Sequence, residues 1–229
     1  MTSMLVLGFF IGIRHAFEPD HVAAVASLAS RTTTLRQALR HGAVWGLGHT
    51  LTLFMICGAA LSLQKNLPVD IAHMLEVIVG IMLVLLGLDV VRRLVRERIH
   101  FHAHVHSGGD SHFHAHSHRG ESLKSHNPRK HEHTHPARFP YRSLFVGLMH
   151  GMAGSAALIV LTVQSADSFW LGMAYVALFG VGSIVGMAVF SAVISVPLRS
   201  AKAVTWAHNT LQGAIGGGTV VLGVMTIIG

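Results

Sequence analysis

Charged residues are scarce in this sequence. They make up 12% of its 229 residues, whereas a soluble domain usually carries about 25%. Hydrophobic residues make up 51%, so the composition predicts an integral membrane protein. The formal net charge of +7 does not indicate nucleic-acid binding, because the basic residues cluster in a few short loops between apolar stretches, as membrane topology signals do.

Three further features are lacking. Cys57 is the single cysteine, which excludes an internal disulfide framework and a four-thiolate zinc site. No P-loop motif occurs, so the chain does not drive itself with ATP. The first residues, MTSMLVLGFF, contain no Lys or Arg before the apolar run, so we expect a membrane span here rather than a cleaved signal peptide.

Long apolar stretches are abundant instead. A transmembrane helix needs about 20 mostly apolar residues, and polar or proline-containing segments separate six such stretches. We therefore expect an all-α integral membrane protein with six transmembrane helices. The expected spans are 3–29, 40–63, 71–91, 143–164, 168–196 and 204–228.

The two halves of the sequence resemble each other. Three pairs of segments match in the same order at a nearly constant offset, although a shared content of Gly, Val and Leu is an alternative explanation. If the repeat is real, each unit contains three spans. Because three is an odd number, the second unit has the opposite orientation in the membrane. Such inverted repeats are typical of secondary transporters. The matching pairs are 9–16 with 144–151, 46–50 with 180–184, and 75–87 with 211–223.

The basic residues predict the orientation in the membrane. Loops rich in Lys and Arg face the cytoplasm, and the alternating spans place only Lys65 on the opposite side, with Arg14 inside the membrane. We therefore expect both termini outside and three regions: a first three-helix repeat over 1–91, a cytoplasmic His-rich loop over 92–142 and a second repeat over 143–229. The basic residues expected on the cytoplasmic side are Arg31, Arg36, Arg40, Arg92, Arg93, Arg96, Arg98, Arg119, Lys124, Arg129, Lys130, Arg138, Arg142, Arg199 and Lys202.

The segment RHAFEPDH (14–21) places ionisable residues inside the first span. His15 lies about 18 Å into the span at ~1.5 Å per helical residue. This is near the middle of a ~30 Å hydrocarbon core, where such groups are costly and usually functional. Pro19 clashes with the carbonyl group of His15, so we expect the first helix to be broken near Pro19. The break could bring His15, Asp20 and His21 together.

Two imidazoles and one carboxylate form a metal-binding set of donors. They suit a divalent transition metal such as nickel, cobalt or zinc, whereas calcium and magnesium prefer oxygen ligands. His49, at a similar depth in the second span, is a candidate for the further donor that is needed. His150, the repeat counterpart of His15 in the fourth span, is another. For His150, an interhelical hydrogen bond is the alternative role.

Two other residues near this cluster are open to two interpretations each. Glu18 either joins the metal site or pairs with Arg14, one helical turn away. His41 and His49 are eight residues apart and lie roughly on one helical face, so they could form steps along a transport path. Alternatively, His41 lies at the level of the lipid headgroups. Glu18 and His41 are therefore candidates for the pathway or for coupling.

Polar residues also begin the third and sixth spans. Asp70, His73 and Glu76 could draw cations to the outer mouth of a pathway. The alternative is an ordinary solvated helix start with Asp70 as the N-cap. The roles of His208 and Asn209 are open as well. His73 and Glu76 are thus further candidate pathway residues.

The stretch RHAFEPDHVAAV (14–25) resembles a known family signature. A His, four residues and then Asp-His is similar to the motif of the nickel/cobalt permease (NiCoT) family, and LGHTLT (47–52) resembles the second histidine motif in their next span. The resemblance is strong over residues 9–54 and implies a high-affinity Ni²⁺ or Co²⁺ transporter. The residues to which it assigns metal selection are His15, Asp20 and His21, with His49 as an additional ligand.

The second half resembles a shorter branch of this superfamily. Many of the permeases have eight spans, with acidic and threonine-containing motifs in the second half that this sequence lacks. GLMHGMAGSAALIVL (147–161) is instead similar to shorter, urease accessory membrane proteins. FEP (17–19) is similar to a His-Xaa-Xaa-Glu-Pro variant of related nickel/cobalt efflux proteins, which also carry a His-rich loop. Metal preference and transport direction therefore stay open.

Twelve histidines lie between residues 100 and 135. Such a tract is typical of metal binding, and we expect it to be disordered without metal. It then collects or buffers cytoplasmic metal; the alternative is a soluble linker whose histidines bind nothing. The histidines are His100, His102, His104, His106, His112, His114, His116, His118, His126, His131, His133 and His135.

Together these features predict a secondary transporter of Ni²⁺ or Co²⁺, with Zn²⁺ less favoured, in the cytoplasmic membrane of a bacterium or archaeon. Uptake is expected, because a divalent ion moving inward gains roughly 4.6 kcal/mol per 100 mV of inside-negative potential, at ~2.3 kcal/mol per charge. That energy sustains a gradient of about a thousandfold. The alternative is efflux, which needs a coupling ion such as a proton carried by Glu18 or Asp20.

Two other classes of protein share some of these features. A membrane enzyme would need an open metal position and a nearby acid or base, and no second catalytic motif is visible, so no enzyme is expected. An accessory anchor would use the His-rich loop to pass nickel to a partner such as a cytoplasmic nickel chaperone. The expected partners are thus the metal ion, the lipid bilayer and such a chaperone, without a prosthetic group or nucleic acid.

Overall fold

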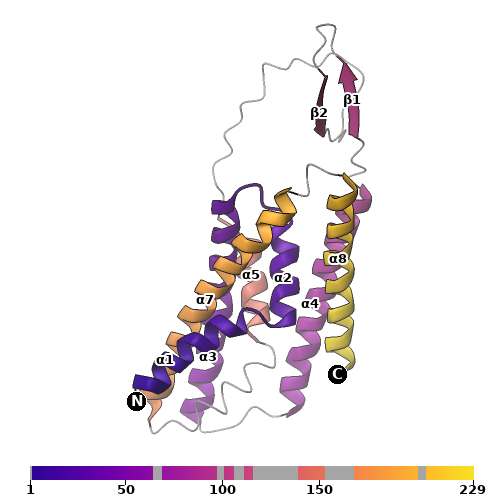
Figure 1. The fold of residues 1–229 in the computed structure, drawn as a ribbon. Helices are drawn as coiled ribbons and strands as arrows, with labels where there is room; N and C mark the ends of the chain where they lie inside the picture. The colour runs from indigo at the N-terminus through magenta and orange to yellow at the C-terminus, as the bar shows by residue number, and fades with distance from the viewer. Residues whose placement is uncertain are drawn as a thin grey trace.

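The computed structural model is mostly a bundle of helices (Figure 1). It describes residues 2–63, 69–96, 101–105, 111–115, 139–152, 168–200 and 205–229. Within these ranges there are seven helices and two short strands. The elements are α1 (Thr2–His15), α2 (Pro19–Ala29), α3 (Leu35–Leu63), α4 (Val69–Arg96), β1 (Phe101–Val105), β2 (Ser111–Ala115), α5 (Tyr141–His150), α7 (Phe169–Ser200) and α8 (Thr205–Ile228).

Four of these helices are long and apolar enough to cross a membrane. Large apolar side chains such as Met55, Leu85 and Met225 are exposed on them, and exposed apolar surface of this extent marks contact with a membrane or a partner. The structure therefore supports a multi-pass membrane protein. The four apolar segments are Leu35–Ser62 in α3, Asp70–Arg96 in α4, Phe169–Leu198 in α7 and Trp206–Ile228 in α8.

The first and fourth expected spans are not single long helices in the described residues. The first is divided between α1 and α2. The fourth is represented by α5, which ends at His150 after ten residues, and most of the remainder, 153–164, lies outside the described residues. The total of six spans therefore stays a prediction.

The predicted break near Pro19 is confirmed. The turn after α1 closes with short-range hydrogen bonds, such as that from the Glu18 N–H to the His15 carbonyl at 3.1 Å. Glu18 has extended backbone, with φ −64° and ψ 146°, the conformation favoured before proline. Pro19 then begins α2, where its missing N–H leaves no helical hydrogen bond unmade. The chain changes direction at this point, part of the way along the bundle (Figure 1).

Glycines let α1 and α5 pack closely against two long helices. Gly12 of α1 faces α7, and a Cβ there would clash with the carbonyl oxygen of Phe179. Gly147 of α5 faces α3 in the same way, against the carbonyl oxygen of Trp45. Small residues at such contacts let backbones approach, as is common between membrane helices. These contacts fix the ends of α1 and α5 that lead into the candidate site.

α4 and α8 form a second close pair on the other side of α2 (Figure 1). A Cβ at Gly80 would lie 2.7 Å from the carbonyl oxygen of Gly223, and a Cβ at Gly87 would lie 2.6 Å from that of Gly216. A helix pair of this closeness requires glycine at both levels.

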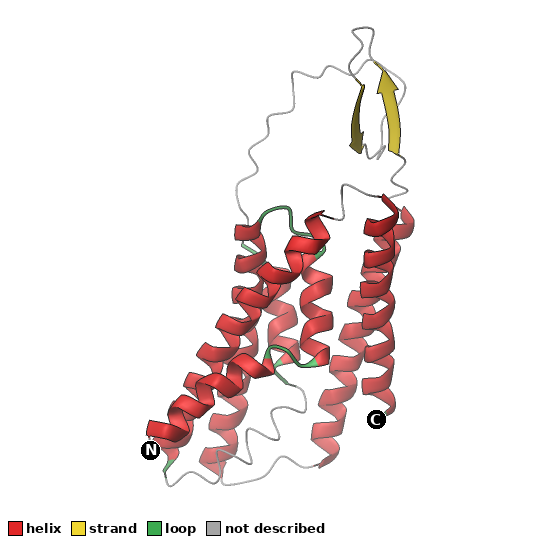
Figure 2. Ribbon diagram, in the orientation of Figure 1, coloured by secondary structure: helices red, strands yellow, loops and turns green. Residues whose placement is uncertain are grey.

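The His-rich region contains a two-stranded antiparallel hairpin, β1 with β2 (Figure 2). In its register His102 lies opposite His114 and His104 opposite His112. No strand was expected here, but FHAHV and SHFHA alternate with a period of two, which is the strand period. The tract's other histidines lie outside the described residues. The hairpin is at the end of the bundle opposite the start of α1 and the end of α8 (Figure 1).

Candidate metal centre

The helix break brings ionisable residues from four helices together. His15 is the last residue of α1, and Asp20 and His21 lie in the first turn of α2. His49 comes from the middle of α3 and His150 from the end of α5. The four imidazoles are at most 3% exposed, whereas Asp20 is 31% exposed. The five residues predicted to bind metal are therefore neighbours in the fold.

His15, His21 and His49 form one part of the cluster. Nε2 of His15 lies 3.1 Å from Nε2 of His49, which is hydrogen-bonding distance. The ring centroid of His21 lies 4.2 Å from that of His15 and 5.0 Å from that of His49. One ring nitrogen of each residue lies within 4.8 Å of the other two. One ion could bind all three with small side-chain movements.

Asp20, His21 and His150 form the other part. Oδ1 of Asp20 lies 2.9 Å from Nδ1 of His21 and also accepts a hydrogen bond from the His21 backbone N–H. Oδ2 of Asp20 lies 3.0 Å from Nε2 of His150. The ligand atoms of this trio are also within 4.8 Å of one another. His21 belongs to both trios.

Three buried ring nitrogens in the cluster lack a hydrogen-bond partner within the described part of the chain. They are Nε2 of His21, Nδ1 of His49 and Nδ1 of His150. A buried polar atom without a partner costs about 1–3 kcal/mol. Imidazole nitrogens with a carboxylate are favourable ligands for a divalent transition metal. The arrangement therefore fits a site that exchanges such internal contacts for bonds to an ion.

Glu18 contacts the cluster from its edge. Its Oε2 lies 3.0 Å from Nδ1 of His15, and the side chain is 49% exposed. Of the two arrangements left open by the sequence, the structure shows the contact with a candidate metal ligand rather than the pair with Arg14. A carboxylate on the far nitrogen of a ligating histidine fixes the orientation of its ring.

The remaining candidate pathway residues, His41, His73 and Glu76, lie outside both trios, as does His208, which was not assigned to the pathway. Nδ1 of His41, on α3, lies 2.7 Å from Oγ of Ser143 on α5. His73 and Glu76 lie near the start of α4, and His208 lies near the start of α8. None of them belongs to a group with metal-binding geometry among the residues that the structure describes. Their roles stay predictions.

Aromatic residues missed by the sequence reasoning enclose the cluster. Trp45 of α3 is fully buried, with its ring centroid 5.5 Å from that of His21 and 5.6 Å from that of His150. Phe179 of α7 lies 5.2 Å from His15. The position of Trp45 one helical turn before His49 was a signal available in the sequence. These rings limit access of water to the histidines.

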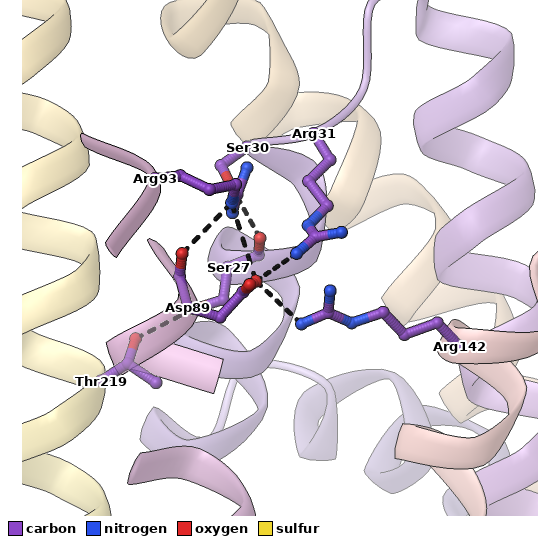
Figure 3. Close-up of polar contacts among 7 residues, drawn as sticks. All are labelled: Ser27, Ser30, Arg31, Asp89, Arg93, Arg142 and Thr219. Carbon is purple, nitrogen blue, oxygen red and sulfur yellow. Dashed lines mark hydrogen bonds and ion pairs between the residues drawn. The ribbon is translucent and has the colours of Figure 1, made fainter. Parts of the chain in front are cut away.

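A second polar cluster joins α2, α4 and α5 (Figure 3). Oδ2 of Asp89 accepts a hydrogen bond from Arg31 and another, at 2.9 Å, from Nη2 of Arg142. Nε of Arg93 lies 3.6 Å from the same oxygen, and Arg93 also donates to Oγ of Ser30 at 3.1 Å. The sequence indicated only a topological role for these arginines. The spacing of Asp89 and Arg93, one helical turn, was the signal for part of this network.

A multi-pass helical protein with a buried His–Asp cluster at a broken helix has the features of a membrane metal-ion transporter. The chain matches the family described as high-affinity nickel-transport protein (NicO) over residues 1–215, and it belongs to that family. The expected membership of the nickel/cobalt transporter superfamily is thereby confirmed. The family is one of transporters and not a class of enzymes.

Individual relatives differ in their described roles. The chain is 32% identical over 225 residues to the urease accessory protein UreH of Bacillus sp. strain TB-90, covering 98% of this chain and 90% of that protein. It is 28% identical over 102 residues to a candidate nickel/cobalt efflux system of Methanocaldococcus jannaschii, covering 43% and 46%. It is 24% identical over 220 residues to the chloroplast protein FOR GROWTH AND FERTILITY 2 of Arabidopsis thaliana, covering 91% and 54%. No solved structure matches the chain.

Proposed function

We propose that the protein is a secondary transporter that carries Ni²⁺ or Co²⁺ across the cytoplasmic membrane. The observation that carries this proposal is the convergence of donors from four helices at the break in the first span. Three of their ring nitrogens have no partner within the described residues. The residues that bind the transported ion in this proposal are His15, Asp20, His21, His49 and His150.

The set of donors favours nickel and cobalt over other divalent ions. Four imidazoles outnumber one carboxylate, which disfavours Ca²⁺ and Mg²⁺. The described role of the family is nickel transport, so Zn²⁺ remains the less favoured cargo. An ion that leaves water for this site regains ligands from the protein, and Asp20 offsets part of its charge.

The fold around the site is proposed to consist of two inverted three-helix repeats. The contact of Gly12 with Phe179 has a counterpart in the contact of Gly147 with Trp45, which lie 135 and 134 residues away in the sequence. A two-fold relation exchanges the partners of each contact in this way. Such repeats place the substrate site at their interface near the membrane midplane.

The pair of α4 and α8 supports the same symmetry. An offset of 136 residues converts Gly80 into Gly216 and Gly87 into Gly223. The contact of Gly80 with Gly223 therefore becomes the contact of Gly216 with Gly87, and the structure contains both. This relation supports the proposed arrangement of six spans in two sets of three.

The orientation and direction follow from charge. The excess of Lys and Arg in alternate loops favours a cytoplasmic His-rich loop and both termini outside. The inside-negative potential then favours uptake of a divalent ion without a coupling ion. The His-rich loop would take up the incoming metal and pass it to a cytoplasmic nickel chaperone.

Efflux is the second candidate function. The relative from Methanocaldococcus jannaschii is described as an efflux system, and a cytoplasmic His-rich loop could equally capture metal for export. Glu18 and Asp20, the two carboxylates beside the histidines, could carry the coupling proton. The relative UreH is described as a urease accessory protein, so delivery of nickel to a nickel enzyme is compatible with uptake.

Flux of radiolabelled ⁶³Ni²⁺ in right-side-out vesicles tests the proposal. Uptake by the wild type should increase with an imposed inside-negative potential and be lost in His15→Ala and Asp20→Ala. His208→Ala, which replaces a buried histidine outside both trios, should retain uptake. Loss of nickel from preloaded vesicles under a proton gradient would favour efflux. Unchanged uptake in both site variants would contradict the proposed site.

A further inference from the structure

We propose that the cluster is two adjacent three-ligand sites that one ion occupies in turn, and that His21 is the ligand common to both. The closed site is His15, His21 and His49, and the open site is Asp20, His21 and His150. This inference rests on the proposed function, because it describes how the ion moves within the site. It differs from a single centre in which all five side chains bind the ion together.

The grouping of ligand atoms favours two sites. Within each trio the ligand atoms lie within 4.8 Å of one another, and among the described residues His21 is the one member common to both groups. The ring centroids of His49 and His150 are 6.0 Å apart, and Nε2 of His15 contacts His49, whereas Nε2 of His150 contacts Asp20. An ion with metal–nitrogen bonds of about 2.1 Å therefore reaches one trio more readily than all five residues.

The ring of His21 lies between the two sites. Its centroid is 4.2 Å from that of His15 and also 4.2 Å from that of His150. Its Nδ1 contacts Asp20, while its Nε2 has no partner within the described part of the chain. A neutral imidazole binds metal through either nitrogen. His21 can therefore serve each site with a different nitrogen when its ring proton moves from one nitrogen to the other, and this makes it the ligand through which the ion is transferred.

The two sites differ in exposure and in charge. In the closed site the three imidazoles are at most 3% exposed, whereas in the open site Asp20 is 31% exposed. The carboxylate makes the open site the better place to exchange ligands with water. The three ligands of the closed site are all imidazoles, and the carboxylate of Glu18 contacts the other nitrogen of His15 rather than the ion. A divalent ion there is therefore less compensated in charge and leaves more readily. Two successive sites, each of moderate affinity for the ion, allow the ion both to enter and to leave.

Both sites cannot hold an ion at once at moderate metal concentration. The two sites share His21 as a ligand. Two divalent ions in adjacent sites would also repel each other strongly in a medium of low dielectric constant. The wild type should therefore bind one ion per chain, distributed between two ligand environments. Nitrogen-only and mixed nitrogen–oxygen environments give Co²⁺ different visible absorption spectra.

Co²⁺ titration of the full chain in lipid nanodiscs, followed by visible absorption and by calorimetry, tests this inference. His49→Ala should leave the open site and His150→Ala the closed site, so each should still bind one Co²⁺, with a different spectrum. The wild-type spectrum should be a weighted sum of the two. The double variant His49→Ala/His150→Ala and the single variant His21→Ala should lose at least 100-fold in affinity. His208→Ala should retain the wild-type spectrum.

Other results overturn the inference. A wild-type spectrum that no sum of the two variant spectra reproduces, together with a large and equal loss of affinity in both variants, indicates a single five-ligand centre. His49→Asn and His150→Asn replace any Ala variant that does not fold. Failure of the proposed function has a different signature: two spectra are present, but the wild type moves neither Ni²⁺ nor Co²⁺ in vesicles. That result supports two binding sites and rejects transport.

Discussion

At the scale of single residues, we expect the position of Glu18 to matter more than its charge. It lies 3.0 Å from Nδ1 of His15, while Nε2 of the same ring points to His49. In the proposed site, the carboxylate would therefore select the tautomer and the orientation in which His15 offers Nε2 to an ion. Outer partners of this kind change metal affinity although they do not touch the metal.

Two substitutions of Glu18 distinguish its effect on the orientation of the His15 ring from the effect of its negative charge. Glu18→Gln keeps an oxygen that accepts a hydrogen bond from Nδ1 of His15, so we expect nickel affinity within a few-fold of the wild type. Glu18→Ala removes the acceptor, and we expect a loss of about 10-fold or more. Calorimetric titration with Ni²⁺ measures both. Equal losses in the two variants would indicate that Glu18 acts through its charge.

At the scale of elements, the interruption between α1 and α2 gives the site its geometry. On a continuous helix Asp20 would lie about 140° and His21 about 240° around the axis from His15, so the three could not face one ion. The extended backbone at Glu18 and the start of a new helix at Pro19 remove this conflict.

Pro19→Ala is expected to weaken the site without unfolding the protein. Alanine restores the N–H that lets α1 and α2 join, so part of the population should adopt a continuous helix with the ligands apart. We expect nickel affinity to fall by about 10-fold while the thermal midpoint stays close to that of the wild type. Pro197→Ala is the matched control, because Pro197 lies inside α7 and outside the cluster. Wild-type affinity in Pro19→Ala would show that tertiary contacts alone hold the break.

The close packing of helices at glycine residues leads to a second prediction. A methyl group at Gly147 would clash with the backbone of α3 at Trp45, whereas one at Gly217 would meet no atom within 4 Å. Overpacking costs about 1–3 kcal/mol, so Gly147→Ala should lower the thermal midpoint by several degrees. Gly217→Ala should leave it unchanged or raise it, because Ala favours the helix. Thermal unfolding in detergent, followed by circular dichroism, compares them. Equal midpoints would contradict the close contact.

The parts of the site that the sequence predicts are those encoded locally. His15, Glu18 and Asp20 interrupt an apolar span, and this pattern predicts the cluster of ionisable residues. Pro19 in the same segment predicts the break in the first helix. His150 was found through its repeat counterpart. Its contact with Asp20, 130 residues away, is decided by how α3 and α4, which each contact both α2 and α5, place those two helices. A contact between distant helices cannot be predicted from the residues of a single segment.

At the scale of the whole molecule, Asp89 connects elements that are distant in the sequence. Its carboxylate binds Arg31, 58 residues before it, and Arg142, 53 residues after it, and Figure 3 shows these side chains converging on one oxygen. Local spacing carries a signal only for the contact with Arg93, one helical turn from Asp89, and this contact was not predicted. Arg31 follows the end of α2 and Arg142 lies in the first turn of α5. The Asp89 network therefore links the element that carries Asp20 with the element that carries His150.

Asp89→Asn therefore tests whether this network supports the site from a distance. The amide leaves Arg31, Arg93 and Arg142 without their shared counter-charge, so their repulsion should lower the thermal midpoint and weaken nickel binding a few-fold. Arg142→Gln in the same chain removes one of the repelling charges, so the double variant should be more stable than the sum of the single effects predicts.

Asp70→Asn, at the other end of α4, is the matched control and should leave the thermal midpoint and the nickel affinity unchanged. Exposed ion pairs each contribute only about 0–1 kcal/mol, so a network with no coupling would give additive effects and unchanged nickel affinity. That outcome would show that α2 and α5 are held by apolar packing alone.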